Sequence, residues 1–281
     1  MPPPSPQSAG QVATAPLIAA NGAGLALVPD WCNLPWLWHG FSTRLGGTSR
    51  SYAPEGVSEL NLGFTADDDR ENVVHNRRLL AEAVTGDPDT LIVTLRQVHS
   101  ALVVVAGSAQ GVQPACEGDG LLTSQPGILL GVQTADCVPV LVADRRRKVV
   151  AALHAGWRGT VKRIVECGIA RMRLEFGSHP EDLLAAIGPA IGSCCYSVGE
   201  ELRTKFQSEF PYAGELFQQV GPGIHLDLFE ANRRQLLSAG LAPESISLAG
   251  GCTACQPQLF FSHRASRGRA GRMLSVIGIA A

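Results

Sequence analysis

Six short stretches of the chain are almost entirely apolar, and they limit the fold more than any other feature. They are rich in Val, Leu and Ile and lie at 91–95, 102–106, 128–132, 138–143, 149–153 and 274–279. A strand without polar alternation must be buried on both faces, so these stretches predict a sheet that is covered by helices. The charged residues DRRRK join two of the stretches and predict an antiparallel hairpin over 138–153, which makes the sheet mixed.

Helical patterns are interspersed among these strands. Residues 67–86 carry acidic side chains in the first turn and end on a glycine, as helices often do. Residues 160–177 place apolar side chains at helical spacing. Two further helices are predicted by pairs with capping spacing, Ser197 with Glu200 and Asp227 with Glu230. We therefore predict an α/β protein with a single-domain α/β/α layered fold and a mixed central sheet.

The predicted domain covers residues 25–281, in which no linker is visible. Residues 1–24 are rich in Pro, Ala, Ser and Gln, a composition that predicts a disordered leader.

Composition and charge exclude several classes of function. Hydrophobic residues make up 45% of the chain and charged residues 17%, which is typical of a compact globule rather than of disorder or a coiled coil. The net charge of −2 provides no basic surface for nucleic acid. No stretch of about 18 uncharged apolar residues predicts a membrane span. Small-molecule or peptide substrates are the better expectation.

The eight cysteines are expected to be free thiols, some of them metal ligands, in a cytoplasmic protein. The first residues, MPPPSPQSAG, lack the pattern of a secretory signal peptide, which would lead to an oxidising compartment. Cys252 and Cys255 form a CxxC pair. Because the chain has no second CxxC, packed or idle thiols are favoured over half of a zinc site.

Three apolar strands each run into a polar cluster that contains one metal-ligand side chain. The clusters are TLRQVHS at 94–100, GVQTADCVPVLVAD at 131–144 and AALHAGWRGT at 151–160, and the side chains are His99, Cys137 and His154. Two imidazoles and a thiolate with one position left open are a known catalytic zinc set. Separations of 38 and 17 residues match no short ligand motif, so a buried cysteine beside two hydrogen-bonded histidines remains the alternative.

These clusters, together with three further motifs, resemble the YfiH family, whose members are also called laccase-domain proteins, peptidoglycan editing factors and purine nucleoside phosphorylases. The further motifs are EGDGLLT at 117–123, AIGPAIGSCCYSVGEE at 186–201 and CTACQPQLFFSHRASRGRAGRM at 252–273. The resemblance covers roughly residues 36–279. It implies an α/β/α fold for a catalytic domain and a zinc ion held by His99, Cys137 and His154. The family's usual Ser-Tyr-Arg reads Ser262-His263-Arg264 here, so a substrate contact made by that tyrosine in relatives would be altered.

Other polar residues are candidates for substrate binding. Arg44, in the glycine-rich loop STRLGGTS, could clamp a phosphate with two hydrogen bonds. Asn61 and Asp119 could orient ribose hydroxyls or ligand histidines, although turn stabilisation explains them equally well. Asp136 could act as a base or fix an imidazole, and Arg264, at a position where relatives keep arginine, is the best C-terminal candidate for an anion.

The residues present favour some of the activities known for the family over others. Multicopper oxidation needs a multi-histidine cluster, but the chain has seven histidines and no His-x-His pair. Copper could therefore bind without being functional. We expect a zinc-dependent purine nucleoside phosphorylase that takes a small-molecule nucleoside and phosphate, with adenosine deamination as an additional activity. The H-x-E…P-C-x-x-C signature of cytidine-type deaminases is absent, so that activity would use another scaffold.

The alternative is a cytosolic amidase that removes a misincorporated serine from a peptidoglycan precursor, by a zinc-hydroxide or by a Cys137–His dyad. A metal-stabilised binding protein is less favoured, because a structural zinc site normally has four ligands and is closed. We expect no nucleic acid or membrane partner, and a monomer or weak homodimer.

Overall fold

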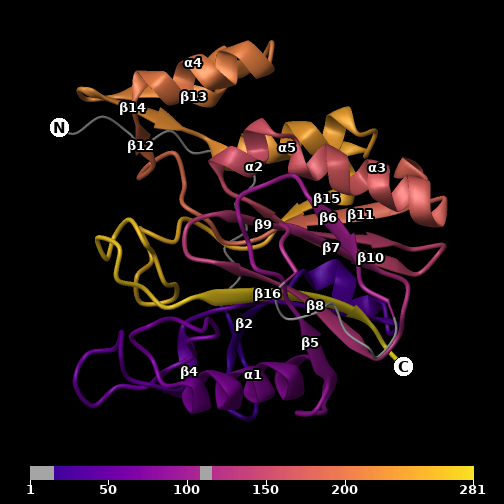
Figure 1. The fold of residues 1–281 in the computed structure, drawn as a ribbon, viewed down its shortest axis with the longest axis vertical. Coiled ribbons are helices and arrows are strands. Elements are labelled where there is room, and N and C mark those ends of the chain that lie inside the picture. Colours follow the sequence, from indigo (N-terminus) through magenta and orange to yellow (C-terminus); the bar gives the residue numbers. More distant parts are fainter. Residues whose placement is uncertain (1–15, 108–115) are drawn as a thin grey trace.

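The computed structural model describes residues 16–107 and 116–281 and has two mixed sheets stacked between helices (Figure 1). The first sheet has six strands in the order β1 (Leu17–Ile18), β2 (Gly24–Ala26), β3 (Leu37–Ser42), β16 (Met273–Ile279), β8 (Ile128–Thr134) and β5 (Leu91–Val93). The second has six in the order β15 (Ile246–Leu248), β11 (Leu183–Ile187), β9 (Val138–Asp144), β10 (Val149–Ala155), β7 (Gly120–Thr123) and β6 (Val103–Val105). In both sheets most neighbouring strands are antiparallel, with parallel pairs at the edges.

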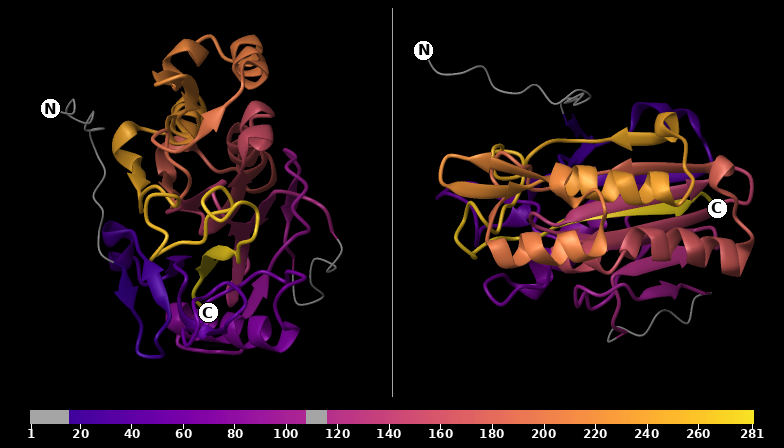
Figure 2. Two further views of the ribbon diagram at one scale, coloured as in Figure 1. Left: turned by 90° about the vertical axis from the view of Figure 1, so that its left-hand side faces the viewer. Right: turned by 90° about the horizontal axis from the view of Figure 1, so that it is seen from above.

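Helices cover the outer faces of the two sheets. Helix α1 (Arg70–Thr85) lies under the first sheet, and α2 (Trp157–Val161), α3 (Ile164–Phe176) and α5 (Leu228–Ser238) lie over the second (Figures 1 and 2). Helix α4 (Glu200–Glu209) accompanies a three-stranded sheet of β12 (Ser197–Val198), β14 (Gly223–Leu226) and β13 (Phe217–Val220). Strand β4 (Leu45–Ser49) packs beside α1. Short 3-10 turns span Pro29–Asn33, Pro180–Asp182, Ala213–Leu216 and Pro243–Ser245.

The continuous apolar strands are explained by this stacking. In β9, Val140 and Val142 point into the core beneath the helices, while Leu141 and Ala143 point into the core between the sheets. Both faces of β9 are therefore buried, so polar side chains are excluded both from the residues that face the helices and from those that face the other sheet. The predicted mixed α/β class is confirmed, and the sheet layer between the helices is double.

The predicted hairpin over 138–153 is confirmed, because β9 and β10 pair antiparallel along their whole length. The helix predicted from residue 67 to 86 is α1, and Gly86 ends it in the left-handed conformation with φ 84°. The helix predicted over 160–177 is interrupted. Arg163 adopts φ 61° between α2 and α3 and breaks the hydrogen-bond ladder there.

One of the two predicted capping pairs is confirmed. The Asp227 carboxylate accepts a hydrogen bond from the backbone N–H of Glu230 at 2.9 Å and caps α5. The prediction for Ser197 was wrong, because this residue lies in β12, paired with His225, and Gly199 precedes the first residue of α4.

Two further expectations touch the described chain. Residues 1–15 of the predicted leader lie outside the described residues. Its last part, residues 16–24, contains strand β1 and the first residue of β2, and Leu17 in β1 pairs with Leu25 in β2. None of the helices in the described ranges combines the length and the hydropathy needed to cross a bilayer.

Candidate metal centre and its surroundings

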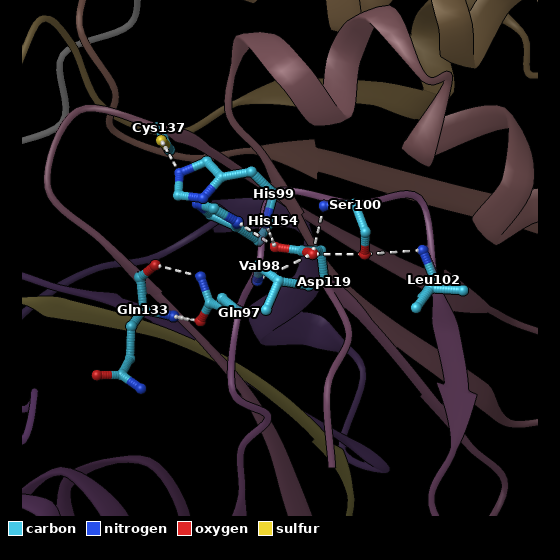
Figure 3. A network of polar contacts seen from close by, with 9 residues as sticks. All are labelled: Gln97, Val98, His99, Ser100, Leu102, Asp119, Gln133, Cys137 and His154. Atoms are coloured by element: carbon cyan, nitrogen blue, oxygen red, sulfur yellow. Dashed lines mark hydrogen bonds and ion pairs between the residues drawn. The ribbon is translucent and has the colours of Figure 1, made fainter. Parts of the chain in front are cut away.

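Two loops and the last residues of strand β10 meet at one end of the second sheet and bring His99, Cys137 and His154 together. Strand β10 ends just after His154, and its antiparallel neighbour β9 begins just after Cys137. The loop that carries His99 lies beside the start of β7, which pairs with the same end of β10. One nitrogen of each imidazole and the thiol sulfur all lie within 4.8 Å of one another, and Figure 3 shows the three side chains side by side. We call these three residues the ligand triad.

Asp119 organises two members of the triad. Its buried carboxylate accepts a hydrogen bond from His154 Nδ1 at 2.8 Å and from the backbone N–H of His99 at 3.0 Å (Figure 3). The same carboxylate accepts the backbone N–H and the hydroxyl of Ser100 at 2.6 and 2.7 Å. A carboxylate on Nδ1 keeps a proton there and fixes the ring, so that Nε2 of His154 is the nitrogen on which a metal ion would displace a proton. Of the roles considered for Asp119, orienting a ligand histidine is therefore the one these contacts describe.

The Cys137 thiol and the His154 ring shift each other's pKa in opposite directions. Burial alone would raise the pKa of the Cys137 thiol, but attraction and hydrogen bonding to His154 and His99 lower that pKa to about 6. Burial likewise opposes a charge on His154, but the Cys137 thiolate and the Asp119 carboxylate raise the pKa of His154 to about 9. Burial would raise the pKa of Asp119, but the hydrogen bonds from His154 and Ser100 and the charge of His154 hold that pKa well below its usual range. At neutral pH the thiol is therefore poised to be a thiolate, as a metal ligand or a nucleophile requires.

The absence of a side chain at Gly156 makes room for the triad. A Cβ atom on this residue would lie 2.8 Å from Cys137 Sγ and 3.0 Å from His99 Cδ2. Its backbone has φ −68° and ψ 170°, which any residue can adopt, so the glycine is needed for space rather than for conformation. Sequence reasoning did not single out Gly156, although it lies two residues after a predicted ligand in HAGWRG.

Asp136 is next to Cys137 in sequence but binds the chain rather than the triad histidines. Its Oδ1 accepts the hydroxyl of Thr253 at 2.6 Å, and its Oδ2 accepts the backbone N–H of Arg264 at 2.7 Å. It adopts φ 94°, an unusual conformation for a side-chain-bearing residue. Both carboxylate oxygens are engaged, so Asp136 serves to hold the C-terminal loop beside Cys137.

Arg264, whose backbone N–H the Asp136 carboxylate holds, packs over Tyr196. We call these two side chains the wall of the candidate site. The guanidinium of Arg264 lies over the Tyr196 ring, 5.2 Å from its centroid, and donates a hydrogen bond to the carbonyl of Ser197 at 2.9 Å. Burial, reinforced by the negative charge of Cys137, raises the pKa of Tyr196 to about 12. Tyr196 therefore stays protonated and can donate a hydrogen bond. Sequence reasoning identified Arg264 and missed Tyr196, which is polar but lies in the motif GSCCYSVG beside the more conspicuous cysteines.

Arg44 makes its contacts with other parts of the chain. It forms an ion pair with Glu59, donates to the carbonyls of Pro257 and Tyr52, and lies over the Phe261 ring. Within the described residues, none of these partners belongs to the ligand triad.

Asn61 is fully buried and uses its amide inside the protein. It donates to the carbonyl of Gly63 and to Asp68, and it accepts the backbone N–H of Gly63 and of Arg272. These contacts describe the turn-stabilising role that the sequence left open.

The chain matches one family model, several named relatives and several solved structures over most of its length. A family model described as "Multi-copper polyphenol oxidoreductase laccase" matches residues 38–280. A Geobacillus stearothermophilus protein named "Purine nucleoside phosphorylase YlmD" is 39% identical over 248 residues, which are 85% of this chain and 89% of that protein. A Bacteroides thetaiotaomicron protein named "Purine nucleoside phosphorylase" is 38% identical over 251 residues, 86% of this chain and 91% of the relative. The crystal structure of the Bacillus licheniformis hypothetical protein YfiH matches with a TM-score of 0.81 at 33% identity, covering 94% of this chain and 98% of that chain.

Proposed function

This chain belongs to the YfiH family, and from that membership we propose that it is a zinc-dependent purine nucleoside phosphorylase. The names of the relatives support the reaction. The structural observation that carries the proposal is the ligand triad, in which Asp119 fixes the orientation of His154. Adenosine deamination is an additional activity that we propose for the same centre.

The triad fits a zinc ion by the chemistry of its donors. Two imidazoles and one thiolate are a catalytic zinc set with a position left for substrate, and the carboxylate on His154 is the usual outer partner of a zinc-bound histidine. The space that Gly156 leaves would be filled by any side chain at that position. A zinc ion held there supplies Lewis-acid chemistry to the site.

The chain's own residues would bind and orient the reactants. In phosphorolysis a phosphate oxygen forms a bond to C1′ of the ribose, while the bond from C1′ to the purine breaks and the purine leaves with the electron pair and takes up a proton. We assign phosphate binding to Arg264, because Asp136, which precedes Cys137, holds its backbone N–H, and because its guanidinium lies over Tyr196 and is exposed enough to meet an anion. Arg44 is a weaker candidate, since Glu59 already occupies its guanidinium.

Product analysis tests the proposal. Full-length protein incubated with adenosine and phosphate should release adenine and ribose 1-phosphate, and His154→Ala should abolish this release. Protein that holds one metal ion per triad and yet releases no free purine base and no pentose 1-phosphate from adenosine, inosine or methylthioadenosine would exclude the phosphorylase assignment.

A multicopper oxidase mechanism does not fit the ligands. Of the seven histidines, all of which the structure describes, only His99 and His154 lie together in a group that could hold a metal ion. One imidazole–thiolate centre can hold a single ion, including copper. It cannot build the multi-histidine cluster that dioxygen reduction requires.

The second candidate is the peptidoglycan-precursor amidase, and the observation in its favour is the pairing of Cys137 with His99. The thiol lies 3.9 Å from His99 Nε2, and its pKa is lowered to about 6 by the two histidines after burial is overcome. This is the arrangement of a cysteine nucleophile with a base. The dyad form of this amidase differs from the phosphorylase in that no metal ion covers Cys137, and alkylation of Cys137 with and without a chelator tests that difference.

The organisation of the chain and its location are further proposals. We propose that residues 25–281 form one catalytic domain, which is supported by the core that the two sheets share. We also propose a cytoplasmic location. It is supported by all eight cysteines being free and by five of them lying in two groups of metal-ligand type, which an oxidising compartment would threaten.

A further inference from the structure

Four cysteines that the proposed function does not use lie together beside the active-site wall. Two follow β11 in the segment 188–196, and two follow β15 in the segment 249–255, and a parallel bridge between Ala190 and Cys252 joins these segments. The four sulfur atoms all lie within 4.8 Å of one another. The four are Cys194, Cys195, Cys252 and Cys255, and we call them the cysteine cluster.

The spacing of the sulfurs suits one tetrahedral metal ion. Zinc–sulfur bonds of about 2.3 Å place the four sulfurs of a tetrahedron about 3.8 Å apart. In the cluster, Cys255 Sγ lies 3.4 Å from Cys194 Sγ and 3.3 Å from Cys195 Sγ. Both distances lie within about 0.5 Å of the tetrahedral spacing, and every pair of sulfurs in the cluster lies within 4.8 Å.

A disulfide explains the arrangement less well. A disulfide joins two sulfurs at about 2.05 Å and would single out one pair. Cys255 is instead nearly equidistant from two thiols of adjacent residues, and the fourth thiol lies within the same 4.8 Å. This convergence of all four sulfurs is what a single ion requires.

The backbone around the cluster also supports a metal site. The backbone N–H of Gly192 donates a hydrogen bond to Cys252 Sγ at 3.2 Å, and such bonds orient thiolate ligands. A Cβ atom on Gly192 would lie 3.2 Å from Cys194 Sγ and from Cys252 Cβ. A larger residue there would press on two of the sulfur-bearing side chains.

We propose that the cysteine cluster is a second metal site of this protein, a closed four-thiolate site for structural zinc. Tetrahedral sulfur-only ligation selects zinc or iron, and four protein ligands leave no position for substrate, unlike the ligand triad. From the sequence alone the site was hidden, because the partner of the CxxC pair is an adjacent CC pair about 60 residues earlier.

The site would brace the wall of the catalytic centre. Thr253, next to Cys252, donates its hydroxyl to Asp136, and the N–H of Ile191, next to Gly192, donates to the Asp136 carbonyl at 2.9 Å. Both segments that the metal would join therefore hold Asp136, which precedes Cys137. Loss of this zinc is expected to loosen the wall without removing a catalytic group.

Metal analysis of purified full-length protein tests the proposal. The double variant Cys252→Ser with Cys255→Ser should contain one zinc ion per chain fewer than the wild type. Cys167→Ser, which changes an exposed thiol outside both groups, is the matched control and should keep the wild-type content. The pair His99→Ala with His154→Ala should still hold the zinc of the cysteine cluster, so this result does not depend on the proposed function. A cluster variant with unchanged zinc content would overturn the proposal.

Two measurements on protein with an intact cluster guard against a variant that fails to fold. After cobalt exchange, the His99→Ala with His154→Ala protein should show the intense thiolate-to-cobalt absorption of a four-thiolate site. In zinc-loaded wild type, the four cluster cysteines should resist alkylation until a chelator is added. Iron in place of zinc, or a disulfide-linked peptide from the zinc-loaded protein under non-reducing conditions, would overturn it.

Discussion

The Asp119 carboxylate accepts the Nδ1 proton of His154 at 2.8 Å and at the same time holds the backbone N–H of His99. One buried acid thus fixes the orientation of one proposed ligand and the loop of another. Such outer partners of metal ligands are worth about 10- to 100-fold in metal affinity. Asp119→Asn keeps the size of the side chain but removes the charge, so we expect zinc affinity to fall by about that factor, measured by competition with a chelator.

Asp30→Asn, in an exposed turn far along the chain from the triad, is the control for this change. An Asp119→Asn protein with wild-type zinc affinity and only lowered thermal stability would show that Asp119 supports the fold alone.

Gly156→Ala tests the space beside the triad. The added Cβ would approach Cys137 Sγ to 2.8 Å, so we expect the zinc of the triad and the activity to be lost while the protein stays folded. The backbone angles at Gly156 are permitted to alanine, which removes strain as an explanation. Gly214→Ala is the matched control, because a Cβ there meets nothing within 4 Å. If Gly156→Ala kept the full metal content of the wild type, the ligand triad would not be a zinc site.

Arg264 and Arg44 should respond differently to removal. Arg264→Ala should raise the KM for phosphate by roughly 10- to 150-fold, because a charge-assisted contact of about 1.5–3 kcal/mol is lost. Arg44→Ala should instead destabilise the protein by about 3 kcal/mol, because it leaves the buried Glu59 without its partner. Phosphate titrations and denaturant unfolding distinguish the two. An unchanged KM in Arg264→Ala would remove it from the phosphate site.

His39 should make the protein sensitive to acid. Its ring accepts the backbone N–H of Val28 at 3.0 Å, and burial lowers its pKa to about 4. Because the folded pKa lies below the unfolded value of about 6.5, stability is complete above pH 6.5 and is lost as the pH falls toward 4, by roughly 3 kcal/mol in total.

Urea unfolding at several pH values checks this prediction. His39→Gln keeps an acceptor for Val28 and cannot titrate, so its stability should change less between pH 6.5 and 4 than that of the wild type. Equal slopes in the two proteins would show that His39 does not carry the acid sensitivity.

The strands and the hairpin were predictable because burial on both faces leaves a local trace, an unbroken apolar run. Their division into two sheets was not, because pairing joins residues far apart: β16 at the end of the chain lies between β3 and β8. A single left-handed residue, Arg163, divides a helix whose apolar spacing continues through the break. Local patterns therefore gave the elements, and long-range pairing decided how they are layered.

The triad was predictable because each member follows or ends an apolar strand and because the family resemblance names the same three positions. The carboxylate that orients it was only one of several options, since an aspartate in EGDG is equally at home in a turn. Asn61 and Arg44 were proposed on chemical type alone, and their contacts with Asp68, Gly63 and Glu59 could not be anticipated from spacing.

Alkylation of Cys137, followed together with turnover, tests the central claim that this residue is a metal ligand in a phosphorolytic centre. Zinc-loaded protein is treated with iodoacetamide with and without chelator, the modified peptides are mapped, and adenosine phosphorolysis is measured in the same samples. A metal-bound thiolate should resist alkylation, and chelation should expose Cys137 and abolish turnover together. Rapid labelling of Cys137 in zinc-loaded protein, with turnover that survives removal of the metal, would contradict the account and favour the cysteine amidase.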